Sequence, residues 1–378
     1  LPRNLIMVSL FGIVAAAGWP RAWIYRNFSY YKMIRRDMMA NKTTRRELLK
    51  ATTYAGAGLW ILGNSGCADF QMGARPRRIS PNEKLNIVGI GAGGKGHGDV
   101  KNAGRRDNII AICDVDNERA SGAMKEFPKA KFYRDFRKML EQKNKEIDAV
   151  TVSTPDHQHA VAAMMAMKMG KHVYVQKPLC HDVYEARKLT EAAKKYGVVT
   201  QMGNQGTAED GLREAVEVIQ SGAIGPVREV HVWTNRPVWP QGIGRPKEVS
   251  PIPTNFSWDL WLGTAPERPF HENTYHPFNW RGWWDFGTGA LGDMACHTAN
   301  MAFMACKLGY PTSVEAEVSP DINDETFPTW SIIRYEFPAR GNMPALKWTW
   351  YDGGDNKPPK AIEAIKKSSF FPAVRNGV

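Results

Sequence analysis

The chain contains few cysteines, five in 378 residues. None of them forms a Cys-x-x-Cys pair, so their spacing excludes a disulfide framework and the familiar thiolate zinc sites, and no metal site is expected. Long apolar runs are also scarce. The uncharged run from Leu5 to Trp19 is shorter than the roughly 20 residues that a membrane-spanning helix needs. The five cysteines are Cys67, Cys113, Cys180, Cys296 and Cys306.

Acidic residues are scarce in the first 80 residues, which hold 13 Lys and Arg but 3 Asp and Glu. The net charge of the whole chain is +12, so most of the excess lies in this leader and the rest is nearly neutral. A nearly neutral folded part argues against a nucleic-acid partner, because binding nucleic acid needs a basic surface. The length predicts two domains after the leader.

Residues 43–50, Thr-Thr-Arg-Arg-Glu-Leu-Leu-Lys, resemble a twin-arginine export signal. An uncharged apolar stretch and then small residues follow, in the order found in a cleavable targeting peptide. We therefore expect residues 38–68 to be a signal peptide recognised by the twin-arginine translocase, residues 69–80 to be a linker, and the protein to be periplasmic or otherwise extracytoplasmic. The alternative is an ordinary surface helix that starts with a basic pair.

Two features of the leader leave alternatives open. Cys67 follows Ser65 and Gly66 as in a lipobox, although Asn64 stands where an aliphatic residue is usual, so Cys67 is a candidate lipid anchor. The chain starts with Leu, and two methionines at positions 38 and 39 precede the export signal. We expect residues 1–37 to be upstream translation and not native protein, with an additional membrane anchor as the alternative.

A glycine-rich turn follows the apolar run at residues 85–90, which is predicted to be a strand. Gly89, Gly91 and Gly94 form a Gly-x-Gly-x-x-Gly motif. Such glycines permit a tight turn, a close approach of the backbone to a pyrophosphate, and close packing of the next helix. The sequence therefore predicts a dinucleotide-binding turn.

A second predicted strand, at residues 109–113, ends in Asp114, twenty residues after Gly94. An acid at this place accepts hydrogen bonds from the ribose hydroxyls and repels a 2′-phosphate, so NAD is expected in preference to NADP. Asp116 is the second candidate for this role.

Strands and helices continue to alternate to about residue 205, which predicts a doubly wound parallel sheet, a Rossmann-type NAD-binding domain over residues 81–205. Ligands bind at the carboxyl ends of such strands, so the polar loops at residues 154–159 and 176–178 are expected to face the nicotinamide. Helices are predicted at 135–142, 160–169 and 186–195, and strands at 147–153, 172–176 and 198–202.

Residues 206–378 are predicted to form an α+β domain with an open, mostly antiparallel sheet, so that the chain as a whole is α/β. An aromatic segment at 239–284 separates its first strand from its helix. That segment suits either a sugar pocket or a cover for the sheet. Its candidate substrate-binding residues are His276, Trp280 and Arg281. Strands are predicted at 226–233, 313–318, 330–337 and 345–351, and one helix at 290–308.

Asp293 and His297 are four residues apart on the predicted helix and therefore lie on one face. A carboxylate and an imidazole side by side can share one substrate hydroxyl, and a neutral His can accept its proton. Lys177 would orient the hydroxyl and stabilise alkoxide charge. The alternative is a simple surface pair on a helix.

Taken together, these motifs resemble those of the glucose–fructose oxidoreductase, inositol dehydrogenase and MocA (Gfo/Idh/MocA) family from about Glu83 to the C-terminus. The glycine loop, the Thr154-Pro155 pair with His159, and the Asp293 and His297 pair carry the resemblance, together with Gln176-Lys177-Pro178 in place of Glu-Lys-Pro. The resemblance implies cofactor contacts from Thr154, Pro155, His159 and Gln176, and catalytic roles for Lys177, Asp293 and His297.

The departure at Gln176 means that the residue beside Lys177 cannot form an ion pair with it. The resemblance also implies a homo-oligomer formed through the open sheet, and a longer C-terminus than the one given, so we expect the second domain to be incomplete.

We therefore expect an exported NAD-dependent oxidoreductase that holds its cofactor tightly and acts on a hydroxyl of a sugar, polyol or glycoside. One alternative is an NAD-dependent glycosidase that works by oxidation, elimination and reduction, although the Tyr-Pro-Thr-His motif that we associate with such enzymes is missing. The other alternative is a sugar-binding protein with a vestigial Rossmann domain.

Overall fold

The computed structural model describes residues 75–353 and the backbone of two short strands, β1 (Leu5–Ser9) and β2 (Gly12–Ala15). The predictions for residues 38–68, for Cys67 and for the C-terminal end concern residues outside this description. Within residues 75–353, no helix combines the length and apolar character needed to cross a bilayer.

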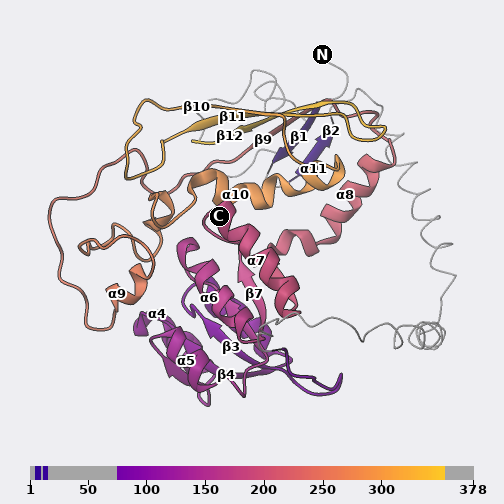
Figure 1. The fold of residues 1–378 in the computed structure, drawn as a ribbon. Helices are drawn as coiled ribbons and strands as arrows, with labels where there is room; N and C mark the ends of the chain where they lie inside the picture. The colour runs from indigo at the N-terminus through magenta and orange to yellow at the C-terminus, as the bar shows by residue number, and fades with distance from the viewer. Residues whose placement is uncertain (1–4, 10–11, 16–74, 354–378) are drawn as a thin grey trace, which may run out of the picture. The chain divides into compact units, whose positions relative to one another are not determined.

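The first domain, in the lower half of Figure 1, is built on a six-stranded sheet. Its strands are all parallel, in the order β5-β4-β3-β6-β7-β8. This order reverses direction between β3 and β6, which is where a doubly wound sheet places its ligand. The predicted Rossmann-type fold is therefore confirmed. The strands are β3 (Asn86–Ile90), β4 (Asn108–Cys113), β5 (Lys131–Tyr133), β6 (Ala149–Val152), β7 (His172–Gln176) and β8 (Thr200–Gly203).

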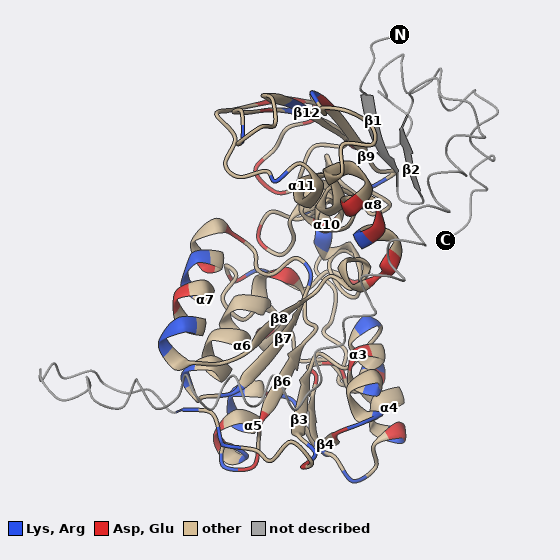
Figure 2. Cartoon of the chain, turned by 90° about the vertical axis from the view of Figure 1, so that its right-hand side faces the viewer, with Lys and Arg blue, Asp and Glu red and all other residues tan. Residues whose placement is uncertain are grey.

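Five helices cover the two faces of this sheet, α3 and α4 on one and α5, α6 and α7 on the other (Figure 2). The central strands are buried on both sides, which explains their continuous apolar sequence. Asp116 accepts hydrogen bonds from the first backbone N–H groups of α4, and Asp182 does the same for α7. The helices are α3 (Lys95–Gly104), α4 (Asn117–Glu126), α5 (Phe136–Gln142), α6 (Asp156–Lys168) and α7 (Val183–Tyr196).

The second domain contains a mixed sheet in the order β10-β11-β12-β9-β1-β2. β10, β11 and β12 pair antiparallel, whereas β9 is parallel to its neighbours β12 and β1. The open, mostly antiparallel sheet predicted for this domain is thus confirmed. Its strands are β9 (Glu229–Trp233), β10 (Ser313–Val318), β11 (Ser331–Phe337) and β12 (Leu346–Tyr351).

Three helices pack on one face of this sheet around Trp348 and Trp350, which are both buried. They are α8 (Asp210–Gln220), which follows the short η1 (Gln205–Ala208), α10 (Gly289–Thr298) and α11 (Asn300–Ala305). The single helix predicted over 290–308 is therefore wrong in extent. It is divided at Ala299, and it stops before Lys307, whose φ of 49° is incompatible with a right-handed helix.

The other face of the sheet is rich in charge. Exposed side chains on it include Glu315, Arg334, Glu336 and Lys347, and Arg334 forms an ion pair with Glu317 at 2.8 Å. The described strands β10, β11 and β12 therefore present a charged face here, unlike the apolar surfaces that obligate interfaces bury. The homo-oligomer expected through this face stays a prediction.

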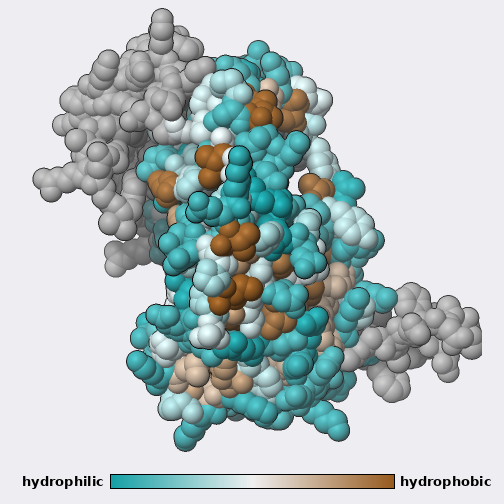
Figure 3. Space-filling model, turned by 90° about the vertical axis from the view of Figure 1, so that its left-hand side faces the viewer, coloured by the Kyte–Doolittle hydropathy of each residue, from teal (hydrophilic) through white to brown (hydrophobic). Residues whose placement is uncertain are grey.

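The long segment between β9 and α10 forms an aromatic cluster of its own, which includes α9 (Trp258–Leu262) and η2 (Asn279–Gly282). Trp258, Trp261, Tyr275 and Trp283 are buried against one another in this cluster. Most of these rings therefore pack against one another in a cluster separate from the core of the sheet, so the segment does not serve mainly as a cover for that sheet. On the face drawn in Figure 3, hydrophobic residues lie in separate groups among hydrophilic ones.

Backbone hydrogen bonds join this aromatic segment to the Rossmann domain. Ser257 N–H donates to the Val115 carbonyl at 2.9 Å, and Asn117 N–H donates to the Asn255 carbonyl at 3.1 Å. The buried His157 ring lies between the carbonyl oxygens of Trp261 and Phe286 at 3.0 and 3.3 Å. The segment thereby closes over the carboxyl ends of the parallel strands.

Candidate functional site

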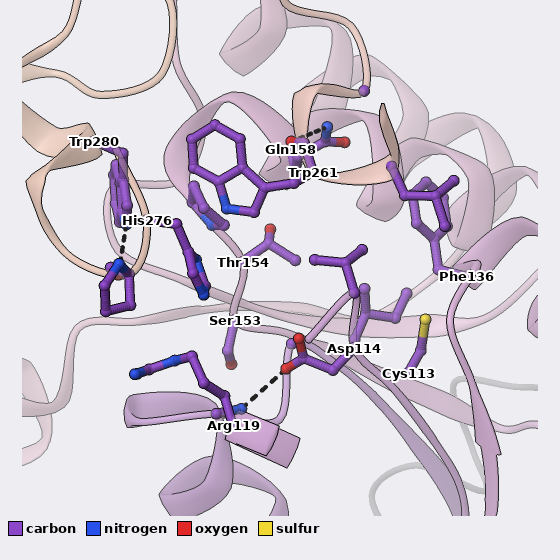
Figure 4. A pocket seen from close by; sticks show the side chains of 18 of the residues that line it. Cys113, Asp114, Arg119, Phe136, Ser153, Thr154, Gln158, Trp261, His276 and Trp280 are labelled. Atoms are coloured by element: carbon purple, nitrogen blue, oxygen red, sulfur yellow. Dashed lines mark hydrogen bonds between the residues drawn. The ribbon is translucent and has the colours of Figure 1, made fainter. Parts of the chain in front are cut away.

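A cavity of about 570 Å³ lies between the carboxyl ends of the parallel strands and the aromatic segment. In Figure 4, Asp114 and Cys113 lie on one side of it, His276 and Trp280 on another, and Arg119 below. The cavity has the size of a dinucleotide or cofactor site and occupies the position that this topology favours for a ligand.

The glycine turn at the end of β3 has a different register from the predicted one. Gly89 lies inside β3, where an added Cβ would meet the side chain of Val100. Gly91 is the first residue of the turn, with φ of 80°, and an added Cβ would lie 2.5 Å from the Ser153 carbonyl oxygen. Gly96 packs so closely on the turn that an added Cβ would overlap Gly91 O.

The sequence contains two overlapping Gly-x-Gly-x-x-Gly motifs, and the structure selects Gly91, Gly93 and Gly96. The reason is the end of β3 at Ile90, because the first glycine of the motif belongs to the turn that follows the strand. The assignment of Gly89 to the cofactor is corrected. Gly91 and Gly94 do line the cavity, Gly94 as the residue before α3 with φ of 54°.

Asp114 lies at the end of β4 and lines the same cavity, as the sequence predicts. Its Oδ2 accepts hydrogen bonds from the N–H groups of Ala92 and Gly93 at 2.7 and 3.1 Å, so the carboxylate also holds the glycine turn in shape. Burial raises the pKa of this carboxyl. Asp116, the second candidate, is committed to capping α4 and to His276, whose ring lies 2.9 Å away.

The residues present fit NAD. Gly91, Gly93 and Gly94 of the turn line the cavity, and α3 begins directly after the turn, as a pyrophosphate site requires. The buried Thr154 hydroxyl has no hydrogen-bond partner within residues 75–353, and Thr154 lines the cavity. An acid rather than a basic residue ends β4. Asp114 at this place favours a dinucleotide without a 2′-phosphate.

Lys177 projects from the end of β7 into the cavity wall and meets α10. Its Nζ donates to Asp293 Oδ1 at 2.8 Å and to the Asp293 carbonyl at 2.9 Å. Arg281 donates to the same Oδ1 through Nε at 3.2 Å. Burial by itself would raise the pKa of the Asp293 carboxyl, but Lys177 and Arg281 outweigh it and hold the pKa below its usual value. The ionic partner of Lys177 is therefore Asp293.

Asp293 and His297 occupy one helix, α10, as predicted, but they do not form a shared wall of the cavity. Asp293 is buried behind Lys177 and Arg281, and these two cations line the cavity instead. His297 is half-buried one turn further on, and burial, together with the charge of Lys177, lowers the pKa of its ring. The ring is therefore neutral at pH 7 and able to accept a proton.

His159 is not in the cavity wall. It is 1% exposed, and its ring nitrogens lie 2.7 Å from the Pro178 carbonyl and 2.8 Å from the Thr154 carbonyl. Burial lowers its pKa to about 4, so the neutral ring donates to only one of these oxygens. The expected cofactor contact is corrected to a positioning role, in which His159 ties together the two loops whose residues Thr154, Pro155, Gln176 and Lys177 line the cavity.

The three candidate substrate residues all line the cavity but have different partners. Arg281 stacks on the ring of Trp280 at 4.2 Å. Arg281 and Lys177 both form ion pairs with Asp293. His276 instead contacts Asp116 and stacks on Phe256 at 4.6 Å, and burial lowers the pKa of its ring. All three line the cavity, but His276 belongs to the side where β4 ends.

Asp156 is a cavity residue that sequence reasoning did not assign. It is 2% exposed at the start of α6, and its Oδ2 accepts a hydrogen bond from the Thr288 hydroxyl at 2.8 Å. Burial raises its pKa to about 7. Its position directly after Thr154-Pro155 could have indicated that it lies near the cavity. The motif does not predict that the carboxyl group is buried.

The Asp156→Asn variant is expected to gain stability relative to the wild-type protein as the pH rises. Because the folded pKa lies above the value of about 3.9 in unfolded chains, the folded state binds more protons between pH 4 and pH 7, and stability falls over that range. Asn removes this loss, which amounts to at most about 4 kcal/mol. Urea unfolding of both proteins at pH 4, 6 and 8 measures it. Parallel pH profiles would show that Asp156 ionises normally.

Two family models match the two domains. The oxidoreductase family model with an NAD-binding Rossmann fold matches residues 84–204, and that family's C-terminal alpha/beta domain matches residues 215–344. The chain belongs to this family, the Gfo/Idh/MocA oxidoreductases.

Among curated relatives, inositol 2-dehydrogenase from Salmonella typhimurium is 30% identical over 151 residues, 39% of this chain and 44% of that enzyme. A glycosyl hydrolase family 109 protein from Solibacter usitatus is 30% identical over 167 residues, 41% of this chain and 37% of that protein. The chain therefore matches less than half the length of these relatives.

The fold is also that of solved structures. The WlbA dehydrogenase from Bordetella pertussis, solved with NADH and UDP-GlcNAcA, has a TM-score of 0.53 at 20% identity, covering 72% of this chain and 74% of that one. An NAD-binding protein from Listeria innocua has a TM-score of 0.51 at 19% identity, covering 72% of this chain and 68% of that one.

Proposed function

We propose that this protein is an NAD-dependent oxidoreductase that oxidises or reduces a hydroxyl-bearing carbon of a sugar or polyol. The observation that carries the proposal is the position of Lys177. Its ammonium group lies in the wall of the cavity that the glycine turn borders, and Asp293 fixes it there at 2.8 Å. A fixed cation at the carboxyl ends of the strands is suited to hold a hydroxyl that reacts at a nicotinamide.

The residues of the chain supply binding and proton transfer. When NAD is bound, it supplies the acceptor for the hydride. Lys177 Nζ donates a hydrogen bond to the substrate oxygen and stabilises negative charge as the hydroxyl proton leaves. We assign acceptance of that proton to the neutral imidazole of His297, which lies one turn beyond Asp293 on α10. Burial lowers the pKa of this ring, and Lys177 is close enough for its positive charge to lower the pKa further. Asp293 acts through Lys177 and Arg281, so we class it as a positioning residue.

A carbohydrate-like substrate is supported by the groups around Lys177. Arg281 offers guanidinium donors, and the Trp280 ring, which lines the cavity, holds the Arg281 guanidinium in place by stacking on it. Hydroxyl-rich ligands are recognised by this combination of donors and flat rings. The relative named inositol 2-dehydrogenase supports a polyol or sugar. We retain the proposal that residues 38–68 direct export by the twin-arginine translocase, with the cofactor carried in bound form.

A second candidate is an NAD-dependent glycosidase, favoured by the similarity to the glycosyl hydrolase family 109 protein. The same Lys177 and His297 would then serve an oxidation that is reversed after elimination of the leaving group. Release of a phenol from an aryl glycoside, without net change in NADH, distinguishes this outcome from oxidation of a free sugar.

The purified full-length chain is expected to contain NAD. Heat denaturation should release close to one equivalent of the dinucleotide, identified by mass, because the aromatic segment closes over the cavity. Incubation with the correct sugar before denaturation should convert it to NADH. Protein that contains no dinucleotide and also fails to bind added NADH would contradict the proposal and favour a vestigial domain.

A further inference from the structure

The amide of Gln176 is paired with an acid from another element. Gln176 ends β7, and its Nε2 donates a hydrogen bond to Oδ2 of Asp99 on α3 at 2.8 Å. Both residues are buried, with 5% and 7% of their surfaces exposed. The chain therefore places the Asp99 carboxylate beside position 176, where a Glu-Lys-Pro motif would have the carboxylate of its Glu.

Asp99 is held by donors from two further places. The Ser153 hydroxyl, directly after β6, donates to Oδ2 at 2.9 Å, and Lys95, one turn earlier on α3, forms an ion pair with Oδ1. A buried carboxylate with this many donors is well compensated. The negative charge beside Gln176 therefore comes from Asp99 of α3, and the donors Gln176, Ser153 and Lys95 compensate it.

The carboxylate also fixes how the amide is turned. A carboxylate only accepts hydrogen bonds, so the NH₂ group of Gln176 has to face Asp99. Oε1 is then left to accept the backbone N–H of Lys177 at 3.2 Å. Gly203 of β8 leaves the necessary space, because an added Cβ there would lie 2.8 Å from Gln176 Cδ and Nε2.

We propose that Asp99 carries the negative charge that this site would otherwise have at position 176, and that it positions Lys177 through the Gln176 amide. Asp99 is a positioning residue, since it touches Gln176 and does not line the cavity, whereas Gln176 does. The role of Lys177 in turnover rests on the proposed function, but the placement of the charge does not. Gln176 is then an amide because a second carboxylate would face Asp99 at hydrogen-bonding distance.

Gln176→Glu tests the proposal through the pH dependence of melting. Two buried carboxylates at this distance share one proton, so the folded variant binds more protons than the unfolded chain and loses stability as the pH rises. Its melting temperature should match the wild type within about 2 °C at pH 5 and lie about 5 °C lower at pH 8.5. The titratable side chains that contact the pair are Lys95 of α3 and Tyr174 of β7, and Lys177, directly after β7, contacts Gln176 through its backbone N–H.

Exchanging the two groups should remove the effect. The double variant D99N/Q176E keeps one carboxylate and one amide, so its melting temperature should follow the wild type from pH 5 to pH 8.5. Gln201→Glu on β8 is the control, because Gln201 is exposed and the change of charge is the same. A Gln176→Glu variant without pH-dependent loss, or a double variant less stable than both single variants, overturns the proposal.

Melting is measured without substrate, so this test stands even if the chain turns over no sugar. Where turnover is found, Gln176→Glu at pH 8.5 should lower kcat about tenfold while KM changes less than about threefold, and the double variant should recover kcat. Recovery by exchange separates positioning of Lys177 from a general loss of structure. Unrecovered kcat in a double variant with wild-type melting contradicts the positioning role.

Discussion

Lys177→Met should lower kcat for the sugar substrate by roughly 10³-fold while NADH still binds. In the proposed function, Lys177 supplies the cation that meets the reacting oxygen, and methionine keeps the approximate length of the side chain but removes its charge and its hydrogen-bond donors. Asp293 would keep Arg281 as an ionic partner, so the buried carboxylate is not left alone. Steady-state kinetics, together with a fluorescence titration of NADH, separate the loss of turnover from a loss of binding.

Lys188→Met is the matched control for this variant. Lys188 lies on α7, and its side chain is 44% exposed in an ion pair with Glu191. Exposed pairs of this kind contribute little to stability, so the control should keep activity and melting temperature. If Lys177→Met retains more than about a tenth of wild-type kcat, Lys177 is not the group that stabilises the reacting oxygen.

Gly96→Ala should weaken NADH binding at least about 100-fold and destabilise the Rossmann domain by a few kcal/mol. The new methyl group would overlap the Gly91 carbonyl oxygen and would also press against Ser153 Cβ at 3.1 Å. Neither neighbour can yield easily, because Gly91 belongs to the turn itself and Ser153 follows a central strand. Titration with NADH and urea unfolding measure the two effects.

Gly98→Ala, two residues further along α3, is a strict control. An added Cβ at Gly98 meets no atom within 4 Å, and alanine is a better helix former than glycine. This variant should bind NADH as the wild type does and be slightly more stable. Equal binding by the two variants would contradict the register of Gly91, Gly93 and Gly96 and return the motif to Gly89, Gly91 and Gly94.

The pattern of apolar residues along the sequence was sufficient to predict most of the fold. Buried parallel strands are short continuous apolar runs, so strands could be predicted at residues 147–153 and 172–176 from such runs. The glycine motif could not be placed in the same way, because glycines at 89, 91, 93, 94 and 96 satisfy the pattern twice. Only the end of β3 at Ile90 decides between the two registers, and strand ends are poorly defined by sequence.

The candidate site was predictable where its residues are close in sequence. Asp293 and His297 share a helix face because of their spacing, and Lys177 belongs to a short motif. Contacts between distant residues were not predictable. Asp99 meets Gln176 from 77 positions away, and Arg281 reaches Asp293 from a segment with no regular pattern. Such contacts depend on how α3 and the aromatic segment pack, and no local pattern of residues encodes that.

The backbone bonds between the aromatic segment and the Rossmann domain have a consequence for how long a dinucleotide stays bound. Ser257 and the carbonyls around His157 hold the aromatic segment in place as one wall of the cavity. A local opening of this segment would remove that wall and the contacts it offers to a bound ligand. The residence time of a dinucleotide should therefore shorten when the aromatic cluster is destabilised, even if the glycine turn is unchanged.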